Sequence, residues 1–231
     1  MAFSPLPVPS KPPEDPRVRI LSAAGQEFAE HGYEAATVRD ICAAAGVNVA
    51  AVNYYFGDKK RLYIESVKHA HEERLRRVPH PKWPPGTPPA TKLHQFIATT
   101  LERMMGLGQP AWQVRLMMRE VLQPTEACRE LVENYIRPHF AMLLGILDEL
   151  VAGGLPEADL RRVGLSIMGQ CFLYRAAGDV VGMLVPADDI DTRHGWHAIA
   201  DHITRFSLAA LGSGEALAPR RMAVSSLEVP R

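Results

Sequence analysis

The segment from Thr37 to Lys60 constrains the fold of this chain most, and it reads TVRDICAAAGVNVAAVNYYFGDKK. Thr37 and Asp40 are spaced as a capping box, in which the Thr37 hydroxyl accepts from the Asp40 amide and the Asp40 carboxylate returns to the Thr37 amide. Gly46 can adopt a positive φ, which ends the first helix and turns the chain. Two short helices joined by such a turn predict a helix-turn-helix, whose second helix enters the major groove of DNA.

The second helix of this pair has two distinct faces. Asn48 is its expected N-cap, and Val52 and Phe56, four residues apart, can be buried together. The polar-aromatic run 53–55 must then point elsewhere, where it supplies donors for phosphates and faces for sugar or thymine methyl groups. The small pair Ala50-Ala51 permits a close approach to a groove floor. An ordinary helical hairpin in a protein core is the alternative.

Residues 17–64 resemble the N-terminal domain of TetR-family transcriptional regulators. The matching marks are Ile20, Ala24 and Phe28, the runs His31-Gly32-Tyr33, 37–41 and 45–47, Tyr54-Tyr55-Phe56, Lys59 and Leu62. The chain departs from the commonest pattern at Val52-Asn53, where many members carry Leu-Tyr, and this leaves the base preference open. By this resemblance, the residues expected to face DNA are Thr37, Arg39, Val49, Ala50, Ala51, Asn53, Tyr54, Tyr55 and Lys59.

A second resemblance covers about residues 90–185. The run 118–125 (MREVLQPT) and the later run 135–138 (YIRP) resemble the C-terminal domain of the CecR-like subgroup of TetR-family regulators. This resemblance implies a domain that binds a small-molecule effector and forms a homodimer. It also implies a repressor rather than an activator, and a bacterial cytoplasmic location.

The remaining sequence predicts an all-α protein. Asp15-Pro16 opens the first helix, and further helices are expected at 60–78, 91–106, 110–122, 125–151, 157–178 and 193–211, with Pro138 kinking the helix that contains it. The Pro-rich stretch 79–90 is expected to be a loop. The predicted organisation is a disordered arm at 1–14, a DNA-binding domain at 15–60, an effector-binding and dimerisation domain at 61–211, and a disordered tail at 212–231.

The expected effector pocket is apolar and adaptable. Methionines are spread over the later helices, and thioether side chains fill irregular space and repack at little cost. Plain core packing is the favoured explanation for any single one of them. Four charged residues lie among apolar neighbours and are candidates for a buried pair or a ligand anchor, with a surface or interface salt bridge as the favoured role: Arg115, Arg119, Glu120 and Arg175. The residues predicted to bind the ligand are Met104, Trp112, Met117, Phe140, Met168 and Phe172.

The homodimer is expected to form through the helices at 157–178 and 193–211. An apolar stripe at helical spacing marks the face assigned to this contact, and its members are Leu160, Val163, Ile167, Cys171, Tyr174, Ile199, Ile203 and Phe206. Four helices, two from each subunit, would pack as a bundle. A two-fold dimer of this kind reads a palindromic double-stranded operator.

Composition narrows the alternatives. The chain has 26 basic and 26 acidic residues, so any affinity for nucleic acid must come from local clusters such as Lys59-Lys60-Arg61. Its 3 cysteines are far apart, and Cys42 and Cys171 are expected to be buried. No metal site or cofactor is expected, and no apolar run is long enough to cross a membrane. The alternative function is an all-helical enzyme or carrier for a hydrophobic molecule, which lacks a nucleophile–base pair and a Gly-rich phosphate loop.

Overall fold

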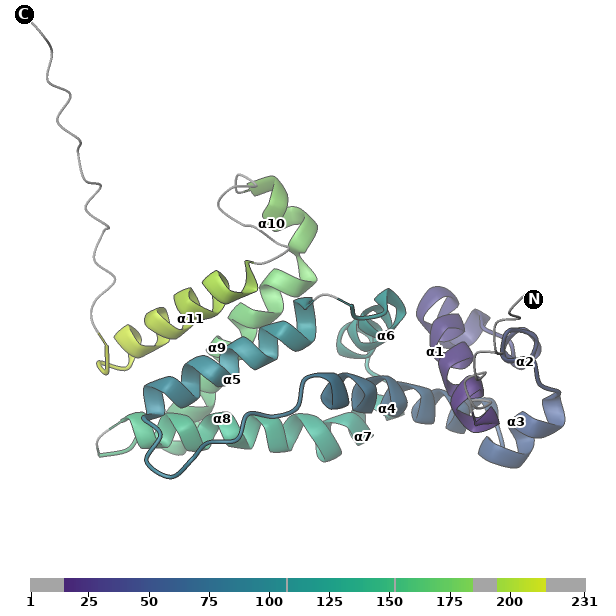
Figure 1. Cartoon of the computed structure of the whole chain (residues 1–231), viewed down its shortest axis with the longest axis horizontal. Helices are drawn as coiled ribbons and strands as arrows, with labels where there is room; N and C mark the ends of the chain where they lie inside the picture. The colour runs from purple at the N-terminus through teal and green to yellow at the C-terminus, as the bar shows by residue number, and fades with distance from the viewer. Residues whose placement is uncertain (1–14, 107, 152, 185–194, 215–231) are drawn as a thin grey trace, which may run out of the picture. The chain divides into compact units, whose positions relative to one another are not determined.

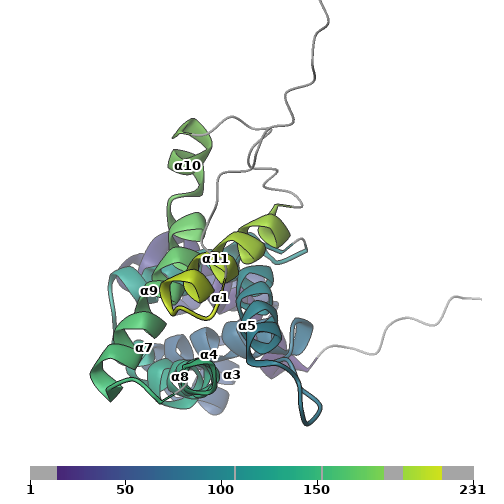
Figure 2. The ribbon, with the colours of Figure 1, turned by 90° about the vertical axis from the view of Figure 1, so that its left-hand side faces the viewer.

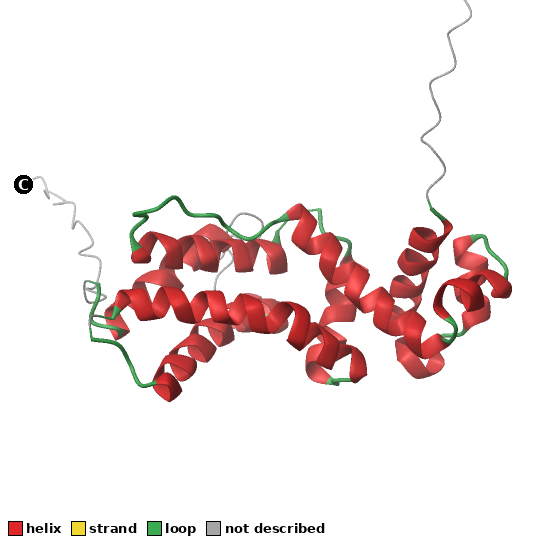
Figure 3. Cartoon of the chain, turned by 90° about the horizontal axis from the view of Figure 1, so that it is seen from below, coloured by secondary structure: helices red, strands yellow, loops and turns green. Residues whose placement is uncertain are grey.

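The computed structural model describes residues 15–106, 108–151, 153–184 and 195–214, and within these ranges it contains helices and no strand (Figure 3). The predicted all-α fold is therefore confirmed. The chain divides into two compact units. The head unit comprises Met1–Arg77 and Gly108–Ile136, and the body unit comprises Val78–Leu107 and Arg137–Arg231.

The helices of the two units alternate along the chain (Figure 1). The head unit contains α1 (Pro16–Ala35), α2 (Val38–Ala45), α3 (Val49–Phe56), α4 (Lys59–Arg77), α6 (Ala111–Leu122), α7 (Glu126–Leu131) and the π-helical turn η1 (Val132–Ile136). The body unit contains α5 (Pro89–Met105), α8 (Arg137–Leu150), α9 (Glu157–Ala176), α10 (Gly178–Leu184) and α11 (Trp196–Ala210).

Helix α1 is the centre of the head unit and packs against α2, α4 and α6. It begins where the sequence predicts, because the Asp15 carboxylate accepts a hydrogen bond of 2.9 Å from the Arg17 amide and Pro16 occupies the first turn. Its buried face includes Ile20 and Phe28. Gly32 interrupts the helix with φ of 80°, a conformation that glycine adopts without steric cost.

Helix α6 is held against α1 by a close steric contact. The indole of Trp112 lies directly on Gly25, and a Cβ added to that glycine would stand 2.3 Å from Cζ3 of the ring. Four residues of α1 later, the Arg119 guanidinium donates from Nε to the Ala29 carbonyl over 3.2 Å and from Nη2 to the Glu30 carbonyl over 3.4 Å. Arg119 therefore binds α6 to carbonyl groups of α1 in the turn that precedes the break at Gly32.

A buried polar network joins α4 to α6 and α7. Glu120 is buried and accepts a hydrogen bond from the Tyr63 hydroxyl. The Thr125 hydroxyl also donates to the same carboxylate over 2.9 Å, and the Thr125 amide donates over 3.3 Å. Burial, followed by the bond to Glu120, raises the pKa of Tyr63 well above its usual value. Arg119 and Glu120, the charged pair left open by the sequence, thus both make contacts within the head unit.

The body unit is organised around α5, which packs against α8, α9 and α11 (Figure 2). Its hydrophobic core includes Leu93 and Ile97 of α5, Leu143 of α8, Ile167 of α9 and Ile203 of α11. Buried polar side chains accompany this core, among them Thr100 and Arg103 of α5. The Thr100 hydroxyl contacts Nε2 of His139 at 3.1 Å, and Arg103 donates from Nε to the Val78 carbonyl over 2.7 Å.

The helix predicted at 125–151 is helical from Glu126 to Leu150, and its irregular turn lies directly before the proline to which the sequence assigned a kink. The segments α7, η1 and α8 follow one another without a gap, and Pro138 is the second residue of α8. A proline has no amide to donate and crowds the carbonyl four residues earlier, here that of Asn134 in η1. The change to i→i+5 bonding in η1 accommodates this proline.

The face of α9 and α11 that the sequence assigned to the dimer is, for the most part, core. Leu160, Ile167 and Cys171 of α9 are buried within the protomer, as are Ile199 and Ile203 of α11. The prediction failed because a helix facing its own core and a helix facing a partner display the same apolar spacing. The large apolar side chains that remain exposed on these helices are Leu165, Leu173 and Phe206.

Several boundaries agree with the sequence and others are outside the described residues. The Pro-rich loop ends where α5 begins at Pro89, and α4 and α6 lie within two residues of their predicted bounds. The arm at 1–14, the break expected at Val185-Pro186 and the tail from residue 215 lie outside the described residues. The assignment of DNA binding to 15–60 and of effector binding and dimerisation to 61–211 stays a prediction. In the structure, α4, α6 and α7 pack in the same compact unit as the helix-turn-helix.

Candidate nucleic-acid interface

Helix α2 begins at a cap that positions its first turn. The Thr37 hydroxyl accepts from the Asp40 amide over 3.1 Å, as the capping box predicts. The Asp40 carboxylate differs from the prediction, because it bonds the Thr37 hydroxyl at 2.5 Å instead of the Thr37 amide. Gly46 ends the helix in the left-handed conformation with φ of 64°. The exposed Thr37 and Arg39 therefore project from the first turn of a well-capped helix.

Helix α3 shows the two faces that its sequence predicts. The Asn48 side chain caps it by accepting from the Ala51 amide over 2.9 Å, and Val52 and Phe56 are buried against the head core. The outward side chains include Val49, which is 46% exposed, and Tyr54, which is 83% exposed. Asn53 and Ala50 are exposed on the same helix. A helix with a buried side and this exposed side is the form of a recognition helix.

The predicted DNA-facing residues fall into three groups in the structure. Thr37 and Arg39 are exposed at the start of α2, and Val49, Ala50, Asn53 and Tyr54 are exposed on α3. Tyr55 and Ala51 lie toward the side of α3, with Tyr55 38% exposed and its ring 5.1 Å from that of Tyr54. Lys59, the ninth residue of the set, lies at the start of α4.

The two lysines after α3 already have partners within the head unit. Lys59 donates from Nζ to the Glu34 carbonyl over 3.1 Å and lies over the Tyr33 ring, 4.8 Å from its centroid. Lys60 pairs with Glu126 of α7, and this ion pair raises the pKa of Lys60 and lowers the pKa of Glu126. Both lysines therefore brace the segment around α3 in addition to contributing positive charge.

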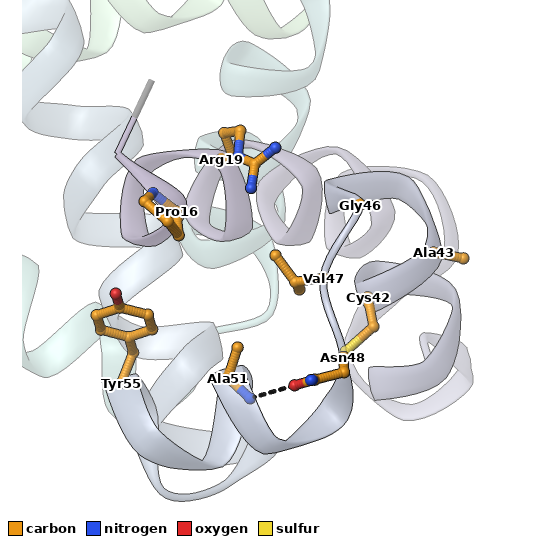
Figure 4. Close-up of a pocket in the computed structure, with 9 residues that line it drawn as sticks. All are labelled: Pro16, Arg19, Cys42, Ala43, Gly46, Val47, Asn48, Ala51 and Tyr55. Atoms are coloured by element: carbon orange, nitrogen blue, oxygen red, sulfur yellow. Dashed lines mark hydrogen bonds between the residues drawn. The ribbon is translucent and has the colours of Figure 1, made fainter. Parts of the chain in front are cut away.

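An open groove of about 600 Å³ runs beside α3 (Figure 4). Its walls come from the start of α1, the end of α2, the turn and the side of α3. The lining residues are Pro16, Arg19, Cys42, Ala43, Gly46, Val47, Asn48, Ala51 and Tyr55. Tyr55 and Ala51, two of the residues predicted to face DNA, thus form one side of this groove.

The six predicted ligand-binding residues are divided between the units. Trp112 and Met117 pack on the head core, whereas Met104, Phe140 and Met168 pack on the body core. Phe172 is half-buried on α9 in the body unit. The Trp112 ring packs directly on Gly25, a structural contact that its sequence position alone did not reveal.

The cysteines and metal-ligating side chains form no further site in the described part of the chain. Cys42 and Cys171 are buried, as predicted, and Cys128 is half-buried, all three as free thiols. Burial raises the pKa of Cys171 to about 12, which keeps it protonated and unreactive at neutral pH. Among the described residues, no three His, Cys, Asp or Glu side chains are grouped as a metal ion would require. No described helix is long and apolar enough to span a membrane.

A capped helix-turn-helix with an exposed recognition helix, carried on an all-helical chain, defines a DNA-binding transcription regulator. Comparison with known families agrees. Residues 20–65 match the family described as bacterial regulatory proteins, tetR family. Residues 89–211, more than half of the chain, match the C-terminal domain of the HTH-type transcriptional dual regulator CecR. The chain belongs to the TetR family of transcriptional regulators, with a C-terminal domain of the CecR type.

Individual relatives support this assignment over different lengths. CecR of Shigella flexneri is 28% identical over 209 residues, which cover 83% of this chain and 85% of CecR. The HTH-type transcriptional repressor AcnR of Corynebacterium efficiens is 46% identical over 52 residues, 22% of this chain and 28% of AcnR. A tetR-family regulatory protein from Rhodococcus RHA1 has a similar fold, with a TM-score of 0.64 at 18% identity over 88% of this chain and 99% of that one.

By its sequence position Arg19 can flank the recognition helix, as Arg17 and Arg39 can, but it is not among the nine residues predicted to face DNA. Arg19 is three residues after Pro16 on α1, and a helical turn places both on the wall of the groove. The signal was the basic residue itself, which stands near the start of a helix that precedes a helix-turn-helix. Only the packing of α1 across the turn shows that it lies beside α3.

Proposed function

We propose that this protein is a ligand-responsive repressor that binds double-stranded DNA through the exposed face of α3. The observation that carries the proposal is the contrast on one short helix, where Val52 and Phe56 are buried while Asn53 and Tyr54 are exposed. On this helix, polar and aromatic side chains are exposed to solvent in the free protein. Such a surface is suited to pack against a partner. The family identity makes that partner operator DNA.

Within this interface the residues have different tasks. Asn53 can bond adenine through both atoms of its amide, so we assign it to base recognition. Thr37 and Arg39 stand at the N-terminus of α2, where a hydroxyl and a guanidinium suit phosphate contacts. Val49 and Ala50 are small enough to admit the helix to the groove floor. Lys59 contributes charge from a position fixed by Glu34 and Tyr33.

We propose a homodimer formed by the body unit. Leu165 is 62% exposed, Leu173 is 54% exposed, and the two are eight residues apart on one side of α9. Phe206 of α11 is also 45% exposed. Apolar side chains of this size are suited to a partner surface. A two-fold dimer matches a palindromic operator when its recognition helices are about 34 Å apart, and sedimentation equilibrium of the purified protein gives the subunit number directly.

The effector site is proposed in the body unit, among the predicted residues that this unit contains. Met104, Phe140 and Met168 flank a core made of aliphatic side chains, and the neighbouring Phe172 is half-buried. Flexible thioether and aromatic side chains suit an apolar ligand of variable shape. A ligand that favours a body conformation with a different spacing of the heads lowers DNA affinity by its differential binding free energy.

Repression and a cytoplasmic location complete the proposal. AcnR, which is similar to this chain over 52 residues, is a repressor, whereas CecR is a dual regulator. The similarity to AcnR supports steric blocking of a promoter as the simplest action. An all-helical enzyme or carrier, the alternative from sequence, has no comparable support from the family or the fold.

Footprinting on the DNA upstream of the chain's own gene tests the proposal. We expect one protected, palindromic site, and we expect Asn53→Ala to change the preferred base within it. Ser166→Ala, an exposed polar change on α9, is the matched control and should leave the footprint unchanged. A screen of apolar small molecules on the bound complex then identifies an effector by release. Absence of any protected site, with the protein folded, would contradict the proposed function.

A further inference from the structure

The groove beside α3 contains one basic side chain and no acidic one. Of its nine lining residues, Arg19 is the only charged group, and the others are small, apolar or polar and neutral. Its guanidinium reaches over the helix-turn-helix turn, with Nη1 4.0 Å from where a Cβ on Gly46 would stand. Arg19 is exposed at this position. The groove is therefore a concave surface with a single positive charge at its edge.

Arg19 differs from two arginines near it in the head unit. Arg17, two residues earlier on α1, is paired with Glu65 over 3.0 Å, and Arg61 is paired with the same glutamate over 2.8 Å. Within the described part of the chain, the Arg19 guanidinium forms no hydrogen bond or ion pair. A cation that is left without a carboxylate, where nearby arginines have one, is available for an anion from outside.

The opposite wall of the groove supplies polar donors. The Asn48 side-chain oxygen is used to cap α3 through the Ala51 amide, and this orients the NH₂ group of the same side chain away from the cap. Tyr55 adds a phenolic hydroxyl, and it is 38% exposed (Figure 4). The first amides of α3 also lie at this end of the groove, where the helix dipole favours negative charge.

We propose that this groove is a second DNA contact, in which the sugar–phosphate backbone of one operator strand lies between α1 and α3 and Arg19 binds one of its phosphates. The inference rests on the proposed DNA-binding function and adds a contact that the recognition-helix face does not include. The small side chains Ala43, Gly46 and Ala51 leave room for the deoxyribose. Arg19 and Asn48 supply the donors that phosphate oxygens require.

The occupant follows from charge and position. A single exposed cation with neutral donors, opening beside a recognition helix, complements a phosphodiester strand that runs along the major groove edge. An apolar small molecule would gain little from a groove this open, because most of its surface would stay in water. A partner protein would find only Tyr55 as a large aromatic anchor in the lining, without the cluster of apolar side chains that a stable protein interface uses.

The first test combines a variant with a modified operator. Each phosphate at the edge of the footprint is replaced singly by an uncharged methylphosphonate, and binding is measured with the wild type and with Arg19→Ala. We expect one substitution to weaken the wild type by roughly fivefold, the upper range for an exposed ion pair, and to leave Arg19→Ala unaffected. Arg19→Ala should also lower the salt slope by about 0.9. Arg19→Lys should retain most of that slope.

Arg115→Ala is the matched control, because Arg115 is an exposed arginine in the same unit on α6, away from the groove lining. It should keep the wild-type affinity and salt slope. Thermal melts of all variants should agree with the wild type, because neither arginine is buried. If Arg19→Ala matched the wild type on every operator, the groove contact would be wrong while specific binding by the wild type still upheld the proposed function.

The second test blocks the groove directly. In a Cys128→Ser background, Ala43→Cys places a thiol in the groove lining, and Ala44→Cys places one on the next, exposed residue of α2 outside it. Both variants are labelled with fluorescein maleimide. Label at residue 43 should reduce operator affinity at least tenfold, and bound operator should slow labelling there. Label at residue 44 should do neither. Equal operator affinity for the protein labelled at residue 43 and its unlabelled form would overturn the proposal.

Discussion

The head unit and the body unit each have an apolar core, and they place their polar contacts differently. In the head, polar and steric contacts link several helices, including Trp112 on Gly25, Arg119 on the carbonyls of α1, and Glu120 between Tyr63 and Thr125. In the body, the polar contacts of buried side chains centre on α5, from Thr100 to His139 and from Arg103 to the Val78 carbonyl.

This difference bears on what each unit is suited to do. Directional contacts fix one arrangement of helices, because a buried donor or acceptor without its partner costs free energy. A head built in this way presents α2 and α3 in a constant geometry. Apolar packing tolerates rearrangement when volume is conserved, and the proposed effector site and subunit contact both lie in the body, where such packing surrounds α5.

The largest expected effect comes from two glutamate substitutions on α9. Ile167 is 1% exposed in the body core, so Ile167→Glu buries a charge and should cost about 3–5 kcal/mol of stability. Leu165 is 62% exposed, so Leu165→Glu should leave the protomer folded and prevent dimerisation. Thermal denaturation and sedimentation equilibrium measure the two effects separately.

Leu165→Ser provides the control for lost apolar area without added charge and should weaken the dimer less. A dimeric Leu165→Glu protein would place the subunit contact elsewhere. A stable, well-packed Ile167→Glu protein would show that the body core is far more open than its burial indicates.

Removal of the Glu120 carboxylate should give the next largest effect, now in the head. Glu120→Ala leaves the Tyr63 hydroxyl and the Thr125 donors without an acceptor, and we expect a loss of about 3 kcal/mol. Glu120→Gln retains one acceptor oxygen and should lose less. Chemical denaturation followed by circular dichroism measures both, and equal stability of Glu120→Ala and the wild type would remove the basis for the contrast between the units.

A single methyl group should disturb the contact between α1 and α6. In Gly25→Ala the new Cβ meets the Trp112 ring at 2.3 Å, so the ring or the helix must shift at a cost of about 1–3 kcal/mol. Gly145→Ala on α8 has open space at the added Cβ and should be neutral or slightly stabilising, because alanine favours helix. Thermal melts of the two variants give the comparison. Gly25→Ala with an unchanged melting temperature would mean that the indole moves freely.

The smallest effect concerns acid. Burial lowers the pKa of His69 in the head and of His80 in the body below the usual 6.5, and Arg103 lowers that of His80 further. The folded state therefore disfavours the protonated form. The resulting contribution to stability is complete above pH 6.5 and decreases as pH falls from there through the folded-state pKa values.

Stability should therefore decrease on acidification from pH 7 toward pH 5, and His80→Gln should reduce that dependence. His202, an exposed histidine on α11, provides the control variant His202→Gln, which should keep the wild-type dependence. Identical pH profiles for His80→Gln and the wild type would assign the acid sensitivity to other groups.

The helix-turn-helix of the head unit could be predicted from local sequence patterns. Thr37, Gly46 and Asn48 act through bonds or backbone angles within a few residues, and the structure contains each cap where the sequence placed it. The burial of Val52 and Phe56 followed from helical spacing alone. The partner of Asp40 was missed because the Thr37 residue offers two donors, its amide and its hydroxyl, and the carboxylate accepts from the hydroxyl.

The packing of the body unit was harder to predict from the sequence because it depends on contacts between residues far apart in the chain. The stripe containing Ile167 and Ile203 was assigned to a dimer, but spacing cannot distinguish a side chain that faces its own core from one that faces another subunit. The residues predicted to bind the ligand are divided between the two units for the same reason. Trp112 and Met168 are both apolar residues on helices, and the sequence does not show that the first packs in the head and the second in the body.

By itself, the sequence determined an all-helical chain and the capped helix-turn-helix, because caps, glycine turns and apolar spacing act over a few residues. The TetR-family character came from the resemblance of residues 17–64 to known members. The tertiary structure alone decided that α6 and α7 pack with the DNA-binding helices, that Trp112 is seated on Gly25, and that Arg19 borders a groove beside α3. These contacts join residues far apart in the chain. They depend on the volume and direction of side chains from several helices at once, which no local pattern encodes.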